Sequence, residues 1–352
     1  MRILLTTVPF YPSIGGLNPI AYLCAREWVR RGHEVRLLTR NPGRFEGEDE
    51  FPIFRCLTFR QMLPHYQWAD VVFQNHVSIH FWLPLLVVKR PYVVSMSGWA
   101  TRRAGGGTGK PRLPERARYV LMRWILRMAT KNIGACAAVA AANEVSARVI
   151  PNPFNSTRFR NTNPSYENRS AAVLFAGRLV ADKGADDLIR AVALLKKRSV
   201  ICNALIAGDG PELENLLELS RNLSVADQIS FVGPKSSTDL ATLMNQHRVM
   251  VVPSKWNEPI AIVALEAMAC GCVVVGSEGG GLAVTIGPCG LTFPNGDYEI
   301  LADRLADILA RGSALTRFTD RIAEHLERYI PECVCGEYLE VLEQAHRRKR
   351  PI

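Results

Sequence analysis

Short apolar runs alternate with amphipathic runs along the first part of the chain. Apolar runs separated by amphipathic segments are typical of parallel strands that helices cover on both faces. Between the first two runs, Asn18 can cap a helix, Pro19 suits its first turn and Gly32 suits its end. The pattern therefore predicts a parallel α/β sheet with strands at 3–8, 34–39, 69–74 and 92–97.

A polar segment then interrupts the alternation. From Ile150 to Ser170 the chain is rich in Pro, Asn and Ser, which is typical of a linker. The alternation resumes behind it, with strands predicted at 172–176, 203–207, 229–232, 249–253 and 273–276. Helices are predicted at 185–197, 211–223, 237–246, 260–269 and from about residue 298.

The chain is thus expected to form two doubly wound α/β halves. We place an N-terminal domain at 1–160, a second domain at 161–325, and a C-terminal helix with a basic tail at 326–352 that can cross back to the first domain. A length of 352 residues agrees with two domains of roughly 150 residues each. Ligands of such sheets bind beyond the carboxyl ends of the strands, so we expect a shared site in a cleft between the halves.

Composition narrows the class of protein. Apolar residues make up 48% and charged residues 22%, and no apolar run approaches the roughly 20 residues of a membrane span. The start of the chain lacks the features of a secretory leader, and the nine scattered cysteines suit reduced thiols in the cytoplasm. The pairs Cys270/Cys272 and Cys333/Cys335 have no partner pair with zinc spacing, so we expect no metal, no disulfide and no cofactor.

A net charge of +10 predicts attraction to an anionic partner. The segment from Arg102 to Lys131 contains nine basic residues and a single acid, Glu115, and a helix is predicted from Pro114. Its apolar arc can pack on the N-terminal half with the arginines solvated. Alternatively, the helix can lie on an anionic membrane surface. The segment has no recognised readout motif, so we do not expect a nucleic-acid partner.

Three segments carry candidate chemistry. Gly15 and Gly16 precede a helix start, where free backbone N–H groups favour an anion, although they also fit a tight turn with no ligand. Arg178 and Lys183 lie in a glycine-flanked loop after the first strand of the second half, where they could grip a diphosphate or be solvated surface charges.

The third segment contains two glutamates. Glu258 precedes a helix predicted to start at Pro259, so its carboxylate should lie near the positive helix end. Glu266 falls within an otherwise apolar helix, where a carboxylate without a partner is costly. Sugar hydroxyls could be its partners, and so could a buried arginine.

Together these motifs resemble family 4 of the retaining glycosyltransferases. The resemblance rests on the Gly15-Gly16 loop, Gly177-Arg178-Leu-x-x-x-Lys183-Gly184, and Glu258-x7-Glu266 followed by Ala-x-x-x-Gly. Arg31-Gly-His-Glu-Val and Val149-Ile-Pro-Asn-Pro extend it over nearly the whole chain. It implies the GT-B fold, with two Rossmann-like domains facing across a cleft.

The resemblance also implies roles for the residues. Arg178 and Lys183 would hold the donor diphosphate in place of a metal, with Gly15, Gly16 and Gly177 beside the phosphates. Glu258 would contact the donor sugar, near the backbone N–H groups of residues 260 and 261, and Glu266 would accept hydrogen bonds from the ribose. Together, Arg178, Lys183 and Glu258 would form the catalytic group. The family is usually given a front-face mechanism, in which the leaving phosphate takes the proton of the acceptor hydroxyl.

Several positions depart from the family pattern. Ile260-Ala261 stands where many relatives have Phe-Gly, which adds a methyl group near the donor sugar. Ser97, before Gly98, stands where many relatives have histidine on the acceptor side, and His76 matches another frequent acceptor-side histidine. His76 could also be a histidine of the core. After the strand at 273–276, Gly279-Gly-Gly-Leu-Ala lacks the usual acid.

We therefore expect a metal-independent retaining hexosyltransferase that moves a sugar from a UDP or GDP type donor to a saccharide or lipid-linked saccharide. The setting would be bacterial surface polysaccharide or glycolipid synthesis, at the inner face of the plasma membrane. The alternative is a catalytically silent GT-B module that binds nucleotide or polysaccharide in a membrane assembly. The sequence does not specify the sugar, base, acceptor, linkage or oligomeric state.

Overall fold

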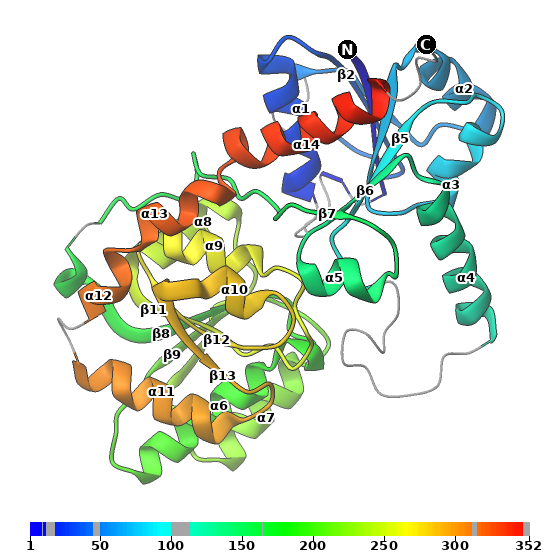
Figure 1. Ribbon diagram of the computed structural model, residues 1–352. Coiled ribbons are helices and arrows are strands. Elements are labelled where there is room, and N and C mark those ends of the chain that lie inside the picture. Colours follow the sequence, from blue (N-terminus) through cyan, green and yellow to red (C-terminus); the bar gives the residue numbers. More distant parts are fainter. Residues whose placement is uncertain are drawn as a thin grey trace. The chain divides into compact units, whose positions relative to one another are not determined.

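The computed structural model describes residues 1–8, 10–11, 18–44, 50–99, 113–163, 165–311 and 315–347. The chain divides into two compact units (Figure 1). The first unit comprises Met1–Asn155 and Arg328–Ile352, and the second comprises Ser156–Glu327. Each unit is built on a parallel sheet with helices, which confirms the prediction of two α/β halves.

Within the described residues, the first unit holds a seven-stranded parallel sheet in the order β3-β2-β1-β4-β5-β6-β7. Its strands are β1 (Arg2–Thr7), β2 (Glu34–Thr39), β3 (Ile53–Arg55), β4 (Val71–Asn75), β5 (Tyr92–Met96), β6 (Lys131–Gly134) and β7 (Arg148–Val149). Its helices are α1 (Asn18–Arg30), α2 (Phe59–Trp68), α3 (Ile79–Trp82), the 3-10 helix η2 (Leu83–Leu86), α4 (Leu113–Met128), α5 (Ala137–Ala142) and α14 (Pro331–Arg347).

The described part of the second unit has a six-stranded parallel sheet in the order β10-β9-β8-β11-β12-β13. Its strands are β8 (Ser170–Ala176), β9 (Ala204–Ala207), β10 (Ile229–Phe231), β11 (His247–Val252), β12 (Val273–Ser277) and β13 (Gly290–Phe293). Its helices are α6 (Ala185–Lys197), α7 (Leu213–Asn222), α8 (Ser237–Gln246), α9 (Ile262–Ala269), α10 (Leu282–Ile286), α11 (Tyr298–Arg311), α12 (Thr316–Thr319) and α13 (Ile322–Leu326). Short 3-10 helices occur at η3 (Tyr166–Asn168), η4 (Ala181–Lys183), η5 (Gly287–Cys289) and, at the boundary between the units, η7 (Glu327–Tyr329).

Burial explains why these runs form these elements. Every residue of β4 and β5 is buried, as expected for central parallel strands covered on both faces. In the second unit, α6 places Leu188, Val192 and Leu195 in the core, spaced by four and three residues along one helical face. The two cores thus follow the two periodicities of the sequence.

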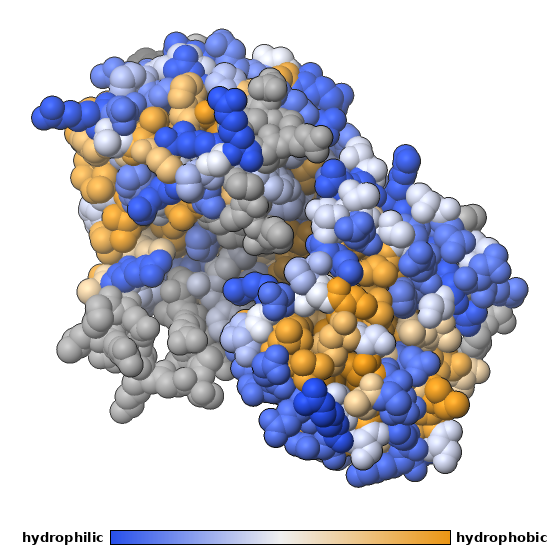
Figure 2. Space-filling model, turned by 180° about the vertical axis from the view of Figure 1, so that it is seen from behind, coloured by the Kyte–Doolittle hydropathy of each residue, from blue (hydrophilic) through white to orange (hydrophobic). Residues whose placement is uncertain are grey.

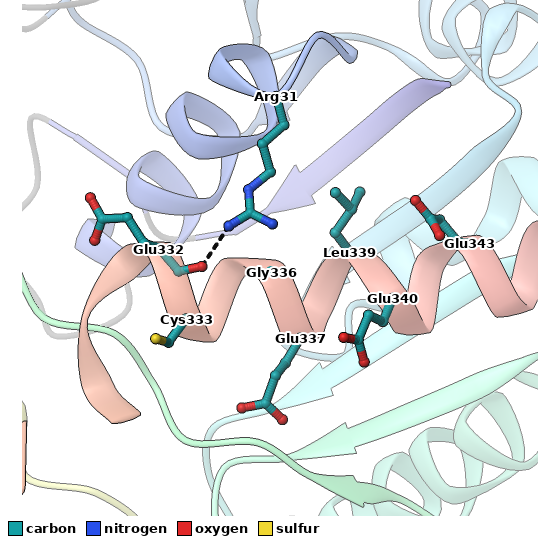
Figure 3. A pocket seen from close by; sticks show the side chains of 8 residues that line it. All are labelled: Arg31, Glu332, Cys333, Gly336, Glu337, Leu339, Glu340 and Glu343. Atoms are coloured by element: carbon teal, nitrogen blue, oxygen red, sulfur yellow. Dashed lines mark hydrogen bonds between the residues drawn. The ribbon is translucent and has the colours of Figure 1, made fainter. Parts of the chain in front are cut away.

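The last helix, α14, belongs to the first unit although it follows the second unit in the sequence. Trp28 of α1 donates from Nε1 to the carbonyl oxygen of Cys335 at 2.9 Å. Arg31, just after α1, donates from Nη2 to the carbonyl oxygen of Glu332 at 2.6 Å (Figure 3). Both bonds join segments about three hundred residues apart, so α14 is an integral part of the first unit.

The boundary between the units falls after Asn155, whereas the sequence placed it after residue 160. Asn245 supplies the reason: it donates from Nδ2 to the carbonyl oxygen of Arg160 at 3.1 Å and accepts at Oδ1 from the N–H of Thr162 at 2.7 Å. Buried Arg169 also donates to Oδ1 of Asn161 at 2.8 Å. The polar segment after residue 155 is therefore attached to the second unit rather than free.

Candidate functional site

The loop that carries Arg178 and Lys183 lies at the carboxyl end of β8. The chain passes through Gly177 and Arg178 into the 3-10 helix η4, and Gly184 then starts α6 with a φ of +68°. A Cβ atom at Gly184 would overlap the carbonyl oxygen of Pro253. Glycine is therefore required at this position, both for its backbone conformation and for the close approach of the next loop.

That next loop, residues 253–261, follows β11 and is fastened to the first. The N–H groups of Lys255 and Trp256 donate to the carbonyl oxygen of Asp182 at 3.0 and 3.3 Å. Glu258 forms an isolated parallel bridge with Gly280, and its carbonyl oxygen accepts from the N–H of Gly281 at 2.6 Å. Three loops at the carboxyl edge of the second sheet are thus held together by their backbones.

These backbone contacts bring Lys183 and Glu258 together, although they are 75 residues apart. The ammonium of Lys183 donates to Oε1 of Glu258, and Ser254 Oγ donates to the same oxygen at 2.8 Å. Glu258 is buried, whereas Lys183 is partly exposed. One carboxylate oxygen of Glu258 therefore accepts from two donors in a buried position, and the lysine side chain that holds it remains partly exposed.

Arg178 lies in the same loop and is exposed. Among the residues that the structure describes, its guanidinium has no ion-pair partner. An exposed arginine in the same loop as a paired lysine leaves one cation available to an incoming anion, and a guanidinium group suits a pair of phosphate oxygens.

Glu266 lies on α9 and its side chain is largely enclosed by protein. Burial raises its pKa from 4.5 to about 8. In the described part of the chain it has no ion pair, so the alternative of a salt bridge with a buried arginine is not realised there. An enclosed carboxyl group without a charged partner is suited to a polar ligand.

The start of α9 differs from the prediction. The helix was predicted to start at Pro259 or Ile260, but it begins at Ile262. The backbone of Glu258 is held extended by its bridge to Gly280, and Ala261, the residue before the helix, has extended φ and ψ of −92° and 95°. Ile260 and Ala261 therefore form an extended approach to the helix, and the carboxylate of Glu258 does not directly precede the helix terminus.

Two contributors to this site were missed from the sequence. Ser254, buried beside Glu258, resembles any loop serine in the sequence, so no signal marked it. Gly280 has a φ of +75°, and a Cβ there would overlap the carbonyl oxygen of Glu258. The run of three glycines was the available signal, but we interpreted it only as a motif that had lost its acid.

The acceptor-side residues cluster at the carboxyl ends of β4 and β5. His76 has a positive φ of 72°, and its Cε1 lies 3.7 Å from where a Cβ of Gly98 would be. Burial lowers the pKa of His76, and within the described residues its Nδ1 has no hydrogen-bond partner. Ser97 Oγ donates to Oδ1 of Asn152 at 3.3 Å. The predicted residues Gly15 and Gly16 lie outside the described residues.

The part of the chain that the structure describes contains no group of three or more His, Cys, Asp or Glu arranged to hold a metal ion. None of the described helices is both long enough and apolar enough to cross a bilayer.

Comparison with known proteins finds a family match in the second unit. Residues 156–325 match the family described as glycosyl transferases group 1. The chain is 34% identical over 171 residues to a D-inositol 3-phosphate glycosyltransferase of Saccharomonospora viridis, a match that covers 46% of this chain and 39% of the relative. It is 35% identical over 150 residues to the enzyme of that name from Corynebacterium jeikeium, covering 40% of this chain and 36% of the relative. The match thus spans well under half the length of these relatives.

Solved structures extend the likeness to the whole fold. Anabaena HepE in complex with UDP and glucose aligns with a TM-score of 0.81 at 19% identity, over 98% of this chain and 100% of that chain. Sucrose-phosphate synthase from Thermosynechococcus elongatus aligns with a TM-score of 0.80 at 21% identity, over 99% and 100%. The chain therefore has the GT-B fold.

Proposed function

We propose that this chain, whose residues 156–325 match the glycosyl transferases group 1 family, is a glycosyltransferase that takes its sugar from a nucleoside diphosphate sugar. The single observation that carries the proposal is the Lys183–Glu258 pair beside exposed Arg178, at the carboxyl edge of the second sheet. Ligands of such sheets bind at this edge. HepE, which shares this fold, has been solved with UDP bound, and this supports the class of donor.

In the proposed reaction the donor diphosphate lies against Arg178 and Lys183. Both cations stabilise the negative charge that develops on the phosphate as the sugar leaves, which is the role that a divalent metal has in other transferases. Glu258, held by Ser254, contacts the hydroxyl groups of the sugar, and Glu266 receives the ribose. The acceptor hydroxyl attacks from the side on which the phosphate leaves and gives it the proton, so the anomeric configuration is retained.

The paired state of Lys183 has a consequence for binding. Its ammonium donates to Glu258, so an arriving diphosphate competes for it. Charge-assisted bonds to a diphosphate can replace this contact, and Glu258 then turns its oxygens to the sugar. We expect donor binding to break the contact between Lys183 and Glu258. Lys183 then contacts the phosphate, and Glu258 contacts the sugar.

The first test is turnover without metal. Purified protein in EDTA is incubated with UDP-, GDP- and ADP-sugars, and release of the nucleoside diphosphate is measured. We expect slow hydrolysis of at least one donor, falling about a hundredfold or more in Arg178→Ala and Lys183→Ala, since each removes a charge contact to the leaving group. Lys196→Ala is the matched control, because this lysine lies in the last turn of α6 and pairs with Asp227 at 3.1 Å. Hydrolysis that is unchanged in both variants would refute the donor site, and activity only with added metal would refute the metal-free mechanism.

The same experiment weighs the alternative of a catalytically silent nucleotide- or polysaccharide-binding module. A silent module binds a donor, seen as a rise in melting temperature, but releases no product. The retention of Arg178, Lys183, Glu258 and Glu266 together favours the enzyme.

For the acceptor we propose a saccharide carried on a lipid, met at an anionic membrane surface during surface polysaccharide or glycolipid synthesis. The supporting feature is the apolar patch formed by α4 and η2, consisting of Val120, Trp124 and Met128 on α4 with Leu86 and the following Val87. Val120 is 65% exposed, Met128 55%, Leu86 56% and Val87 64%. Residues 120, 124 and 128 share one helical face. Figure 2 shows apolar side chains gathered on one face of the first unit.

Charge and packing on the same patch favour this partner. The indole of Trp124 lies edge-on to Trp82 with ring centroids 5.1 Å apart, which joins α4 to the segment before η2. Arg118 and Arg127 on α4 and Lys89 after η2 are exposed as well. Cations around an apolar patch suit a surface of anionic lipid. Ile125 and Leu126 of α4 are buried and already pack this helix on the first unit. The exposed apolar residues of α4 are therefore not needed for that packing.

A further inference from the structure

The carboxyl edge of the first sheet has buried polar side chains where apolar ones would be expected. Asn75 of β4 is in register with Thr7 of β1 on one side and Ser95 of β5 on the other, and all three are at most 1% exposed. Neighbours in register point to the same face of a sheet. Burial of polar groups is unfavourable unless they are hydrogen-bonded, so this row calls for a connected network.

The connection comes from α14, which covers this face. Tyr338 is fully buried, and its ring packs against Phe73 with ring centroids 5.7 Å apart. Its hydroxyl oxygen lies 3.4 Å from Oγ of Ser95 and 3.4 Å from Oδ1 of Asn152. Ser97 Oγ lies 3.3 Å from the same oxygen of Asn152. A chain of contacts therefore runs from Ser95 through Tyr338 and Asn152 to Ser97.

The proton positions along this chain follow from its chemistry. Oδ1 of Asn152 carries no hydrogen, so both Tyr338 and Ser97 donate to it. The oxygen of Tyr338 then accepts from Ser95, its other neighbour. Because the single proton of Ser97 is already used, the lone pairs of its oxygen are what remains for a ligand.

Exposure shows where the chain of contacts ends. Ser95, Tyr338 and Asn152 are buried, and Ser97 is partly exposed. Beside it, His76 presents a buried Nδ1 that has no partner in the described part of the chain. Of these groups, the partly exposed oxygen of Ser97 is the one that a ligand rich in hydroxyl groups can reach.

We propose that Ser95, Tyr338 and Asn152 are positioning residues that fix Ser97 Oγ as a hydrogen-bond acceptor for a hydroxyl group of the acceptor sugar. This proposal rests on the proposed glycosyl transfer. A serine hydroxyl is far too weak a base to remove the proton of the attacking hydroxyl, so Ser97 acts through binding and orientation. The last helix of the chain thereby contributes to acceptor recognition without touching the sugar.

The experiment compares acceptor binding in four variants with the wild type. The probes are p-nitrophenyl glycosides of glucose, galactose and mannose, with binding measured by saturation-transfer NMR and transfer measured with the donor found active. Ser97→Ala and Tyr338→Phe should each weaken binding and raise the acceptor KM about fivefold, the size of one neutral hydrogen bond, with a smaller change in kcat. As acceptor binding weakens, the ratio of sugar transfer to donor hydrolysis should fall.

Asn152 tests the direction of the network. Asn152→Asp keeps an oxygen that can only accept, so it should hold the acceptor KM within about twofold, while Asn152→Leu should raise it as Ser97→Ala does. If Asn152→Asp weakens binding as much as Asn152→Leu, the assigned direction is wrong.

Tyr92→Phe is the matched control for Tyr338→Phe. Tyr92 is also a buried tyrosine of this unit, and its hydroxyl donates to the carbonyl oxygen of Ile125 at 2.8 Å, outside the network. The Tyr92→Phe substitution should lower the free energy of unfolding without changing acceptor binding. Equal glycoside binding in wild type, Ser97→Ala and Tyr338→Phe overturns the proposal. A wild type that binds glycosides but neither transfers nor hydrolyses any donor contradicts the proposed function instead, and the binding comparison still decides on the network.

Discussion

Glu266 is held in an environment that disfavours its charged form. Its pKa is raised from 4.5 to about 8, so the folded protein keeps a proton there that the unfolded chain loses. The contribution of this group to folding stability is therefore present below about pH 4.5 and is lost as the pH rises through 8. A ribose that donates hydrogen bonds to the carboxylate would favour the charged form and lower this pKa.

Nucleotide-sugar binding should accordingly release a proton near neutral pH. At pH 7 the free protein carries the proton on Glu266, and the bound protein carries less of it. Titration calorimetry in two buffers with different ionisation enthalpies measures the difference, which we expect to approach one proton. Affinity should also increase between pH 6 and 8.

Glu266→Gln provides the control for this prediction, because it keeps the shape of the side chain and removes the titration. Proton release of the same size in Glu266→Gln would assign it to another group and remove Glu266 from the ribose site.

At the same scale, the sequence identified the charged residues of the site but not their contacts. Lys183 and Glu258 both stood out, since each carries charge next to glycine or proline at a strand end. That they bond to each other depends on how β8 and β11 pair and on the backbone bonds from residues 255 and 256 to Asp182, which have no signature in the residue types. Ser254 could not be found for the same reason.

At the scale of elements, the site depends on the contact between two loops. Gly184 allows that contact, because any side chain atom there meets the carbonyl of Pro253. Gly184→Ala should therefore destabilise the second unit by several kcal/mol, more than the roughly 1–2 kcal/mol of a left-handed backbone alone. Urea unfolding followed by circular dichroism measures the change in free energy of unfolding.

Gly233→Ala isolates the contribution of the contact. Gly233 has nearly the same φ, +69°, with no heavy atom within 4 Å of its added Cβ. The difference between the two variants reports the approach of the loops rather than the backbone conformation. Equal losses in both variants would mean that the loops separate at little cost.

The elements themselves were largely predictable, because apolar runs and helix caps are local signals. Helices 185–197 and 237–246 were predicted with the observed bounds. The start of α9 was wrong because a tertiary contact, the bridge between Glu258 and Gly280, keeps the chain extended where Pro259 suggested a helical turn. Long-range pairing of this kind overrides a local preference.

At the scale of the whole molecule, the apolar patch on α4 and η2 predicts which face meets a membrane. Sedimentation with vesicles of phosphatidylglycerol should pellet the protein, with less binding to phosphatidylcholine and less at high salt, because both apolar burial and charge contribute. Val120→Asp and Leu86→Asp should each reduce binding several-fold.

The control is Ile201→Asp, since Ile201 is 77% exposed in the second unit, outside the patch. Binding that is equal in all three variants would exclude the patch as the membrane surface. Retention of the protein on RNA or DNA with the same salt dependence, and none on vesicles, would favour a nucleic-acid partner instead.

The sequence placed the division into units within a few residues and allowed a C-terminal helix that crosses back to the first domain, but the contacts that set the division have no local signal. The polar segment after Ile150 marked a boundary, but the side-chain bonds that join Asn245 to Arg160 and Thr162 and so assign these residues to the second unit come from a distant helix. The attachment of α14 to the first unit likewise depends on contacts with Trp28 and Arg31.

The path of the chain has a consequence for how the protein is made. The ribosome delivers the first 155 residues, then the whole of the second unit, and only afterwards the helix that covers Trp28 and Phe73. Until then the emerging first unit exposes an apolar face, whereas the second unit has all its own residues as soon as it has emerged. During translation the later segment should therefore mature before the earlier one, which reverses the usual order of synthesis and folding.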